Sequence, residues 1–179
     1  MGQPYPIFNP QSDDELLRGW LVHAHKCRDR HDLAARRCDT LRYAIGVPTI
    51  TLSAVAGTSV FSALGQNPEL VFRLFVGILS IAAAVFAALQ TFLDYPARAE
   101  RHRIAASKYK GLIHEIEQVL CREPHPESRD TALIAGLRDR LADLEESTPV
   151  VPQHIYDHIE DRYQSFKFVS QALDLVTPR

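Results

Sequence analysis

Two long apolar stretches, residues 43–65 and 70–93, dominate this chain of 179 residues and are separated only by residues 66–69. As helices, at about 1.5 Å per residue, they would be roughly 34 to 36 Å long, enough to cross a hydrocarbon core of about 30 Å. The first stretch contains no Asp, Glu, Lys or Arg. The second contains only Arg73, close enough to its start for the side chain to snorkel toward lipid headgroups. This pattern predicts a transmembrane helical hairpin.

The alternative is a soluble helical protein that buries the hairpin in its own core. A chain of this length can hide one such helix, but two adjacent ones are much harder to cover. We therefore expect an all-α membrane protein, with a transmembrane hairpin and long cytoplasmic helical extensions that form a small bundle. Its parts would be a cytoplasmic amphipathic helix (1–42), a span (43–65), an external turn (66–69), a second span (70–93) and cytoplasmic helices (94–179), all in one unit.

Basic residues flank the two spans on their outer ends and are absent from the turn between them. Because cytoplasmic flanks retain Lys and Arg, both termini are expected in the cytoplasm. No secretory signal is recognisable at the amino terminus, so the first span would act as its own signal anchor. The flanks could also bind anionic lipid headgroups, although they could equally serve only to fix the topology. The candidate headgroup contacts are Arg36, Arg37, Arg42, Arg98, Arg101 and Arg103.

Helix boundaries outside the spans follow from capping and proline patterns. Ser12 and Glu15 have the spacing of a capping box, which predicts a helix that starts there and continues into the first span, bent near Pro48. Residues 94–96 predict a kink after the second span, beyond which the second helix continues into the cytoplasm as far as the prolines at 124 and 126. Further helices are expected at about 129–146 and after a break at Pro152. The last of these could pack in the bundle or form an oligomeric coiled coil, and bundle packing is favoured.

In lipid, helices associate through small residues that allow close approach, so the positions of small side chains predict helix contacts. On the second span they share one stripe, whereas Phe75, Leu79, Phe86 and Leu93 fall on the opposite side, which we expect to face lipid. The stripe consists of Gly77, Ser80, Ala84, Ala87, Ala88 and Thr91. We therefore expect this stripe to pack against a neighbouring helix.

The first span carries two unusual strips. Gly46, Ser53 and Gly57 form a second candidate helix-packing strip. Because a single hairpin needs only one packing face, the other strip suggests contacts between hairpins or a weakly polar surface facing water in an oligomer. That candidate pore-facing strip is Thr51, Val55, Thr58 and Ser62. The alternative is that the hydroxyls bond back to carbonyls of their own helix.

No residue pattern predicts catalysis, a metal site or a cofactor. His114 and Glu115 begin like a zinc-protease helix, but Gln118 stands where the second histidine is needed. Residues 100–103, which include His102, are interpreted as a solvated or lipid-facing charge cluster. The three cysteines are interpreted as ordinary packing residues with reduced thiols. No nucleic-acid-binding patch is indicated, and the spans lack the intramembrane carboxylates typical of selective transporters.

Three short segments carry a family resemblance. They read LQTFL at 89–93, AERH at 99–102 and KYKGL at 108–112, after an arginine-rich helix, a first span and a short turn. In this order the chain resembles the SLATT family, the two-transmembrane effectors associated with SMODS nucleotidyltransferases and SLOG domains in bacterial conflict systems. The similarity covers roughly residues 15–120.

The resemblance implies a membrane effector of a bacterial conflict or antiphage defence system. Such an effector is proposed to oligomerise and permeabilise the inner membrane when triggered. It provides no catalytic residues to transfer. Membrane lipids and further copies of the chain are the partners expected from the basic flanks and the small-residue strips. Because no sensor is fused to this chain, the resemblance also implies that the trigger comes from a separate nucleotide-signalling or sensor protein or from a ligand bound directly. The alternative is a membrane-anchored helical interaction module without pore activity.

Overall fold

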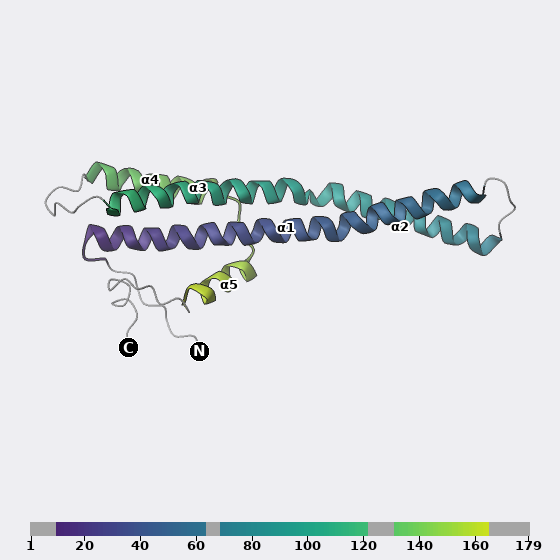
Figure 1. The fold of residues 1–179 in the computed structure, drawn as a ribbon, viewed down its shortest axis with the longest axis horizontal. Helices are drawn as coiled ribbons and strands as arrows, with labels where there is room; N and C mark the ends of the chain where they lie inside the picture. The colour runs from purple at the N-terminus through teal and green to yellow at the C-terminus, as the bar shows by residue number, and fades with distance from the viewer. Residues whose placement is uncertain (1–9, 64–68, 122–130, 165–179) are drawn as a thin grey trace. The chain divides into compact units, whose positions relative to one another are not determined.

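The computed structural model describes residues 10–63, 69–121 and 131–164, and every regular element in these residues is an α-helix (Figure 1). The helices are α1 (Asp13–Ala63), α2 (Leu70–Leu93), α3 (Tyr95–Cys121), α4 (Thr131–Ser147) and α5 (Gln153–Gln164). The all-α prediction and the two long apolar helices are confirmed. The predicted turn at 66–69 and the segment after residue 164 lie almost wholly outside the described residues.

The start of α1 follows the predicted capping pattern. The Ser12 hydroxyl oxygen accepts the Glu15 backbone N–H at 3.3 Å, and the Glu15 carboxylate accepts the backbone N–H of Gln11 at 2.7 Å. These bonds satisfy donors that the first turn of a helix otherwise leaves free. From there α1 runs for 51 residues and continues through Pro48.

A single residue, Asp94, separates α2 from α3. It has left-handed backbone angles, φ 40° and ψ 50°, which end the α2 helix. Asp tolerates this conformation better than most residues with a Cβ. Its carbonyl accepts the Arg98 N–H at 3.1 Å, and its carboxylate accepts the Ala97 N–H at 3.4 Å. Asp94 therefore also caps the start of α3. The sequence predicts a kink here within one continuing helix, whereas the left-handed backbone of Asp94 ends α2, and a separate helix α3 starts at Tyr95.

The chain divides into two compact units, to each of which α1 and α3 contribute. We call one the apolar hairpin, comprising residues 35–63 and 69–100. The other is the polar bundle, comprising residues 10–34, 101–121 and 131–164. Each unit has its own pattern of burial.

The core of the polar bundle joins α1, α3 and α4. Its fully buried members include Leu17, Tyr109 and Leu112, and Leu137 and Leu141 come from α4. The face of α3 that carries Tyr109, Leu112 and Ile116 is therefore a core face. Helix α5 adds Ile155 and Ile159, which are 2 % and 1 % exposed. The described part of α5 thus packs within the chain, as bundle packing predicts.

The apolar hairpin has the opposite character. In each of the two candidate membrane spans, only 6 % of the most apolar window is buried within the protein. Large side chains such as Phe61, Ile78 and Phe92 are 78 %, 68 % and 81 % exposed. A soluble core helix would be covered on most sides, so these helices need an apolar environment outside the chain.

Candidate functional site

In the apolar hairpin, α1 and α2 each have one narrow row of side chains that is at least partly buried, and we call these two rows the seam. Figure 1 shows α2 returning along the C-terminal part of α1, and a Cβ atom built on Gly46 would lie 3.8 Å from the Gln90 side-chain nitrogen. Spacings of three and four mark both rows, as in helices that pack with a small crossing angle. Between residues 43 and 61, the covered residues of α1 are Ile45, Gly46, Pro48, Thr49, Leu52, Ala56 and Ser59. On α2 they are Val76, Leu79, Ala82, Ala83, Phe86 and Leu93.

This seam changes the assignment of faces on α2. Leu79, Phe86 and Leu93 were expected to face lipid, yet all three are partly buried in the hairpin. Phe75, from the same predicted face, is exposed. The expected packing stripe is exposed along its whole length: Gly77, Ser80, Ala84, Ala87, Ala88 and Thr91. Within one chain, these six residues are therefore exposed and lie outside the seam.

The packing strip predicted on α1 is divided. Gly46 lies in the seam beside Gln90, whereas Ser53 and Gly57 are exposed. A Cβ atom added at Gly57 or at Gly77 would meet nothing within 4 Å. Both glycines therefore leave open space on the surface of a single hairpin.

The predicted pore-facing strip is also exposed, at Thr51, Val55 and Thr58, while the side chain of Ser62 lies outside the described residues. The hydroxyl of Thr51 donates to the Val47 carbonyl at 2.9 Å, and that of Thr58 donates to the Ala54 carbonyl at 3.0 Å. On α2, the hydroxyls of Ser80 and Thr91 also donate to carbonyls of their own helix. The alternative interpretation, hydroxyls bonded to their own helix, thus describes the single chain.

The six candidate headgroup contacts are all exposed: Arg36, Arg37, Arg42, Arg98, Arg101 and Arg103. The Arg42 guanidinium lies 5.7 Å from the centroid of the neighbouring Tyr43 ring. A cation beside an aromatic ring is common where a helix leaves a bilayer. Lipid contact by these residues remains a prediction.

A buried histidine pair in the polar bundle contradicts, for His102, the interpretation of residues 100–103 as a solvated or lipid-facing charge cluster. His102 is 7 % exposed and its Nδ1 lies 3.0 Å from Nδ1 of His31, which is 4 % exposed. The Tyr109 ring stacks on His31 with centroids 5.7 Å apart. Burial lowers the pKa of His31 to about 4, helped by His102 and Arg30, and burial also lowers the pKa of His102. Both rings are therefore neutral at pH 7.

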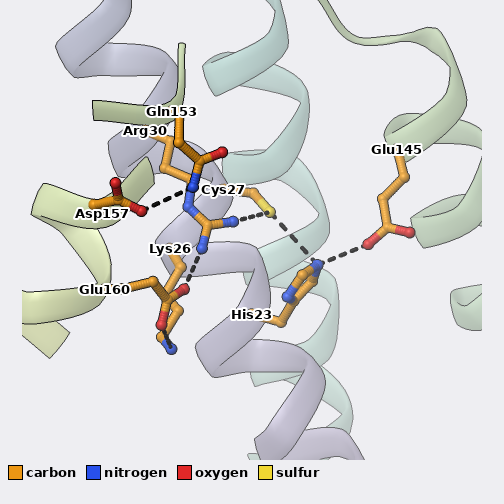
Figure 2. Close-up of polar contacts among 8 residues, drawn as sticks. All are labelled: His23, Lys26, Cys27, Arg30, Glu145, Gln153, Asp157 and Glu160. Carbon is orange, nitrogen blue, oxygen red and sulfur yellow. Dashed lines mark hydrogen bonds and ion pairs between the residues drawn. The ribbon is translucent and has the colours of Figure 1, made fainter. Parts of the chain in front are cut away.

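A charged network joins α1 to α4 and α5 (Figure 2). The Glu160 carboxylate accepts a hydrogen bond from Lys26 Nζ at 2.8 Å and pairs with Arg30. On the other side, His23 Nε2 lies 2.7 Å from Glu145 Oε1 and 3.5 Å from Cys27 Sγ. The Cys27 and Glu145 contacts raise the pKa of His23 against the effect of burial.

Aromatic residues complete the attachment of α5. The Arg30 guanidinium carbon lies 3.7 Å from the centroid of the Tyr156 ring, and the Tyr163 hydroxyl donates to Asp29 Oδ2 at 2.8 Å. Burial and the Asp29 carboxylate raise the pKa of Tyr163. Sequence periodicity did not reveal this network, because its partners are about 130 residues apart.

In the part of the chain that the structure describes, no group of three or more His, Cys, Asp or Glu side chains could hold a metal ion. Glu115 forms an ion pair with Arg140. The cysteines are all free, with Cys27 buried, Cys38 half-buried and Cys121 exposed. The interpretation of cysteines as packing residues therefore fits Cys27 and does not fit Cys121.

Comparison with known families gives one match. A model of the SMODS and SLOG-associating 2TM effector domain family 4 matches residues 15–150, which is most of the chain. No curated protein and no solved structure matches.

Proposed function

Since this chain belongs to the SMODS and SLOG-associating 2TM effector domain family 4, we propose that it is a membrane effector of a bacterial conflict system. In this role, several hairpins assemble in the inner membrane and permeabilise it when the system is triggered. Both termini lie in the cytoplasm, and the trigger comes from a nucleotide-signalling or sensor partner. We assign no catalytic step to the chain.

The observation that carries this proposal is the exposed small-residue stripe of α2. The seam with α1 occupies a different face, so the stripe is not needed to hold the hairpin together. Apolar burial gives little driving force between helices in lipid, and close approach of backbones through small residues replaces it. Within the stripe, Ser80, Ala84 and Ala88 recur every four residues, a spacing that lets another helix approach closely. A second hairpin is the natural occupant.

Substitutions can test this contact without disturbing the single hairpin. Ala84 and Val85 are adjacent and exposed, but Ala84 belongs to the small-residue stripe, whereas Val85 belongs to a separate exposed face that also carries Ile78, Ile81 and Phe92. Ala84→Leu adds bulk where a second hairpin would pack, and Val85→Leu adds bulk toward lipid. Gly57→Leu gives an independent test on α1, because a Cβ atom added there meets no atom within 4 Å.

The experiment is tightly controlled expression in bacterial cells, followed by measurement of membrane potential and dye entry at matched membrane abundance. We expect depolarisation by the parent and by Val85→Leu, and its loss in Ala84→Leu and Gly57→Leu. Cross-linking in membranes should show oligomers in the same two proteins that depolarise. Equal depolarisation by all four proteins would contradict assembly through the small-residue surfaces.

A membrane-anchored interaction module is the second candidate function. The observation in its favour is that the Thr51 and Thr58 hydroxyls are bonded to their own helix, which leaves them less available to line an aqueous path. In that case an unrelated transmembrane hairpin in place of residues 43–93 would preserve activity in the intact conflict system. Loss of activity after this exchange would exclude the tether.

A further inference from the structure

An open pocket of about 350 Å³ lies on the polar bundle, between α3 and the end of α4. This volume is at the small end of the range for ligand sites, about 300 to 1,000 Å³. Every residue that lines the pocket belongs to the same compact unit. The lining consists of Arg101, Ile104, Ala105, Lys108, Ser147, Thr148 and Pro149.

The two cations of the pocket are placed by helical spacing. Arg101 and Lys108 are seven residues apart on α3, so both side chains project from one face of the helix. Ile104 and Ala105 lie between them and form an apolar floor. Neither cation has a hydrogen-bond or ion-pair partner in residues 10–63, 69–121 and 131–164. Two positive charges therefore border the same hollow without a carboxylate to neutralise them.

The opposite wall supplies hydroxyl groups. Helix α4 ends at Ser147, and the Thr148 N–H closes its last turn by donating to the Leu144 carbonyl at 3.1 Å. The side chains of Ser147 and Thr148 then border the pocket. The helix end carries a negative partial charge of about half an elementary charge. The two full charges of Arg101 and Lys108 outweigh it, and no carboxylate is among the lining residues.

We propose that this pocket binds the phosphate group of a phosphate ester. Arg101 and Lys108 provide the charge, Ser147 and Thr148 donate hydrogen bonds to the phosphate oxygens, and the floor formed by Ile104 and Ala105 contacts the carbon part of the ligand. Charge-assisted hydrogen bonds of this type are the strongest that side chains offer to an anion. The ester can be a phospholipid headgroup or a water-soluble molecule. None of these residues lies in the apolar hairpin, so phosphate binding here does not require pore formation by the two spans.

Binding is measured by calorimetry on the full chain in a non-ionic, phosphate-free detergent. Inorganic pyrophosphate is the soluble probe, and short-chain dihexanoyl phosphatidylglycerol is the lipid probe. Binding of pyrophosphate alone assigns the pocket to a soluble phosphate, and binding of the lipid alone assigns it to a headgroup. Binding of both supports a phosphate site open to either source. Binding of neither overturns the proposal.

A charge-matched pair of double variants locates the site. Arg101→Gln with Lys108→Gln removes both pocket cations, and Arg103→Gln with Lys110→Gln removes two cations at the same seven-residue spacing outside the pocket lining. We expect the first to weaken binding by about tenfold or more and the second to change it by less than about threefold. Circular dichroism of both variants checks that α3 remains helical. Equal weakening of binding in both double variants would show that the probe binds a diffuse basic surface, and would overturn the proposed pocket site.

Discussion

His31 and His102 place their Nδ1 atoms 3.0 Å apart inside the polar bundle, although 71 residues separate them in the chain. At this distance one ring donates and the other accepts, so at most one Nδ1 carries a proton in a stable pair. A second proton would put two like charges side by side in a buried place that also adjoins Arg30. The pair therefore favours neutral histidine.

We expect the polar bundle to lose stability as the pH falls from about 6.5 toward about 4. The folded pKa of His31, about 4, lies below its value of 6.5 in an unfolded chain, so the unfolded state binds more protons in this range. The stabilisation is present above pH 6.5 and disappears toward pH 4, by about 3 kcal/mol for this residue. The contribution of His23 to the pH dependence has the opposite sign. Its pKa is raised, so its protonated form stabilises the fold below about pH 6.5.

Thermal unfolding of the full chain in detergent, followed across this pH range, tests the assignment. The double variant His31→Phe with His102→Phe should show a much smaller pH dependence, while the exposed His114→Gln should behave like the parent. If the double variant keeps the parental pH dependence, other groups must cause it.

Glu160 is expected to be the main attachment of α5. Glu160→Gln leaves the buried Arg30 without its carboxylate partner, and hydrogen bonds to charged groups contribute about 1.5 to 3 kcal/mol. Hydrogen exchange of residues 153–164 should become about 10 to 100 times faster. Asp139→Asn removes an exposed pair with Arg138, and because such pairs contribute little, exchange in α5 should not change. Unchanged exchange in Glu160→Gln would show that Ile155 and Ile159 hold α5 alone.

Burial along α3 predicts a second contrast. Ile116 is 1 % exposed in the core of the polar bundle, whereas Ile104 on the same helix is 49 % exposed. Ile116→Ala removes buried methyl groups and leaves a cavity, so it should destabilise the bundle by about 2 to 5 kcal/mol. Ile104→Ala should cost less than about 1 kcal/mol. Equilibrium unfolding of the two variants gives the comparison. Equal losses of unfolding free energy would mean that the face of α3 that carries Ile116 is not its main packing face.

The elements that the sequence predicts well are those determined by local chemistry. The charge-free stretches predict the two spans, Ser12 and Glu15 predict the start of α1, and residues 94–96 predict a kink at the point where Asp94 ends α2. Each of these depends on residues within a few positions of one another.

The errors concern partners that are distant in the chain. His102 was grouped with its charged neighbours because nothing near it indicates His31. On α2, the small residues were expected to pack against a neighbouring helix and the face with Leu79 and Phe86 to contact lipid. Instead, Leu79 and Phe86 lie in the seam, which on α1 contains the small residues Thr49 and Ala56. Large side chains on one helix can fill space beside small ones on the other, so the pattern of one span alone does not identify its seam.

The topology can be tested through Cys121, which is exposed at the end of α3. In a variant that keeps only this cysteine, through Cys27→Ala and Cys38→Ala, a membrane-impermeant maleimide should label inverted membrane vesicles and leave intact spheroplasts unlabelled. Asn67→Cys, placed in the predicted external turn of a chain without other cysteines, should show the reverse. The reason is the clustering of Lys and Arg on the outer flanks of both spans, which holds those flanks in the cytoplasm. Labelling of Cys121 in spheroplasts would place the polar bundle outside the cell membrane, where a cytoplasmic nucleotide-signalling partner could not reach it.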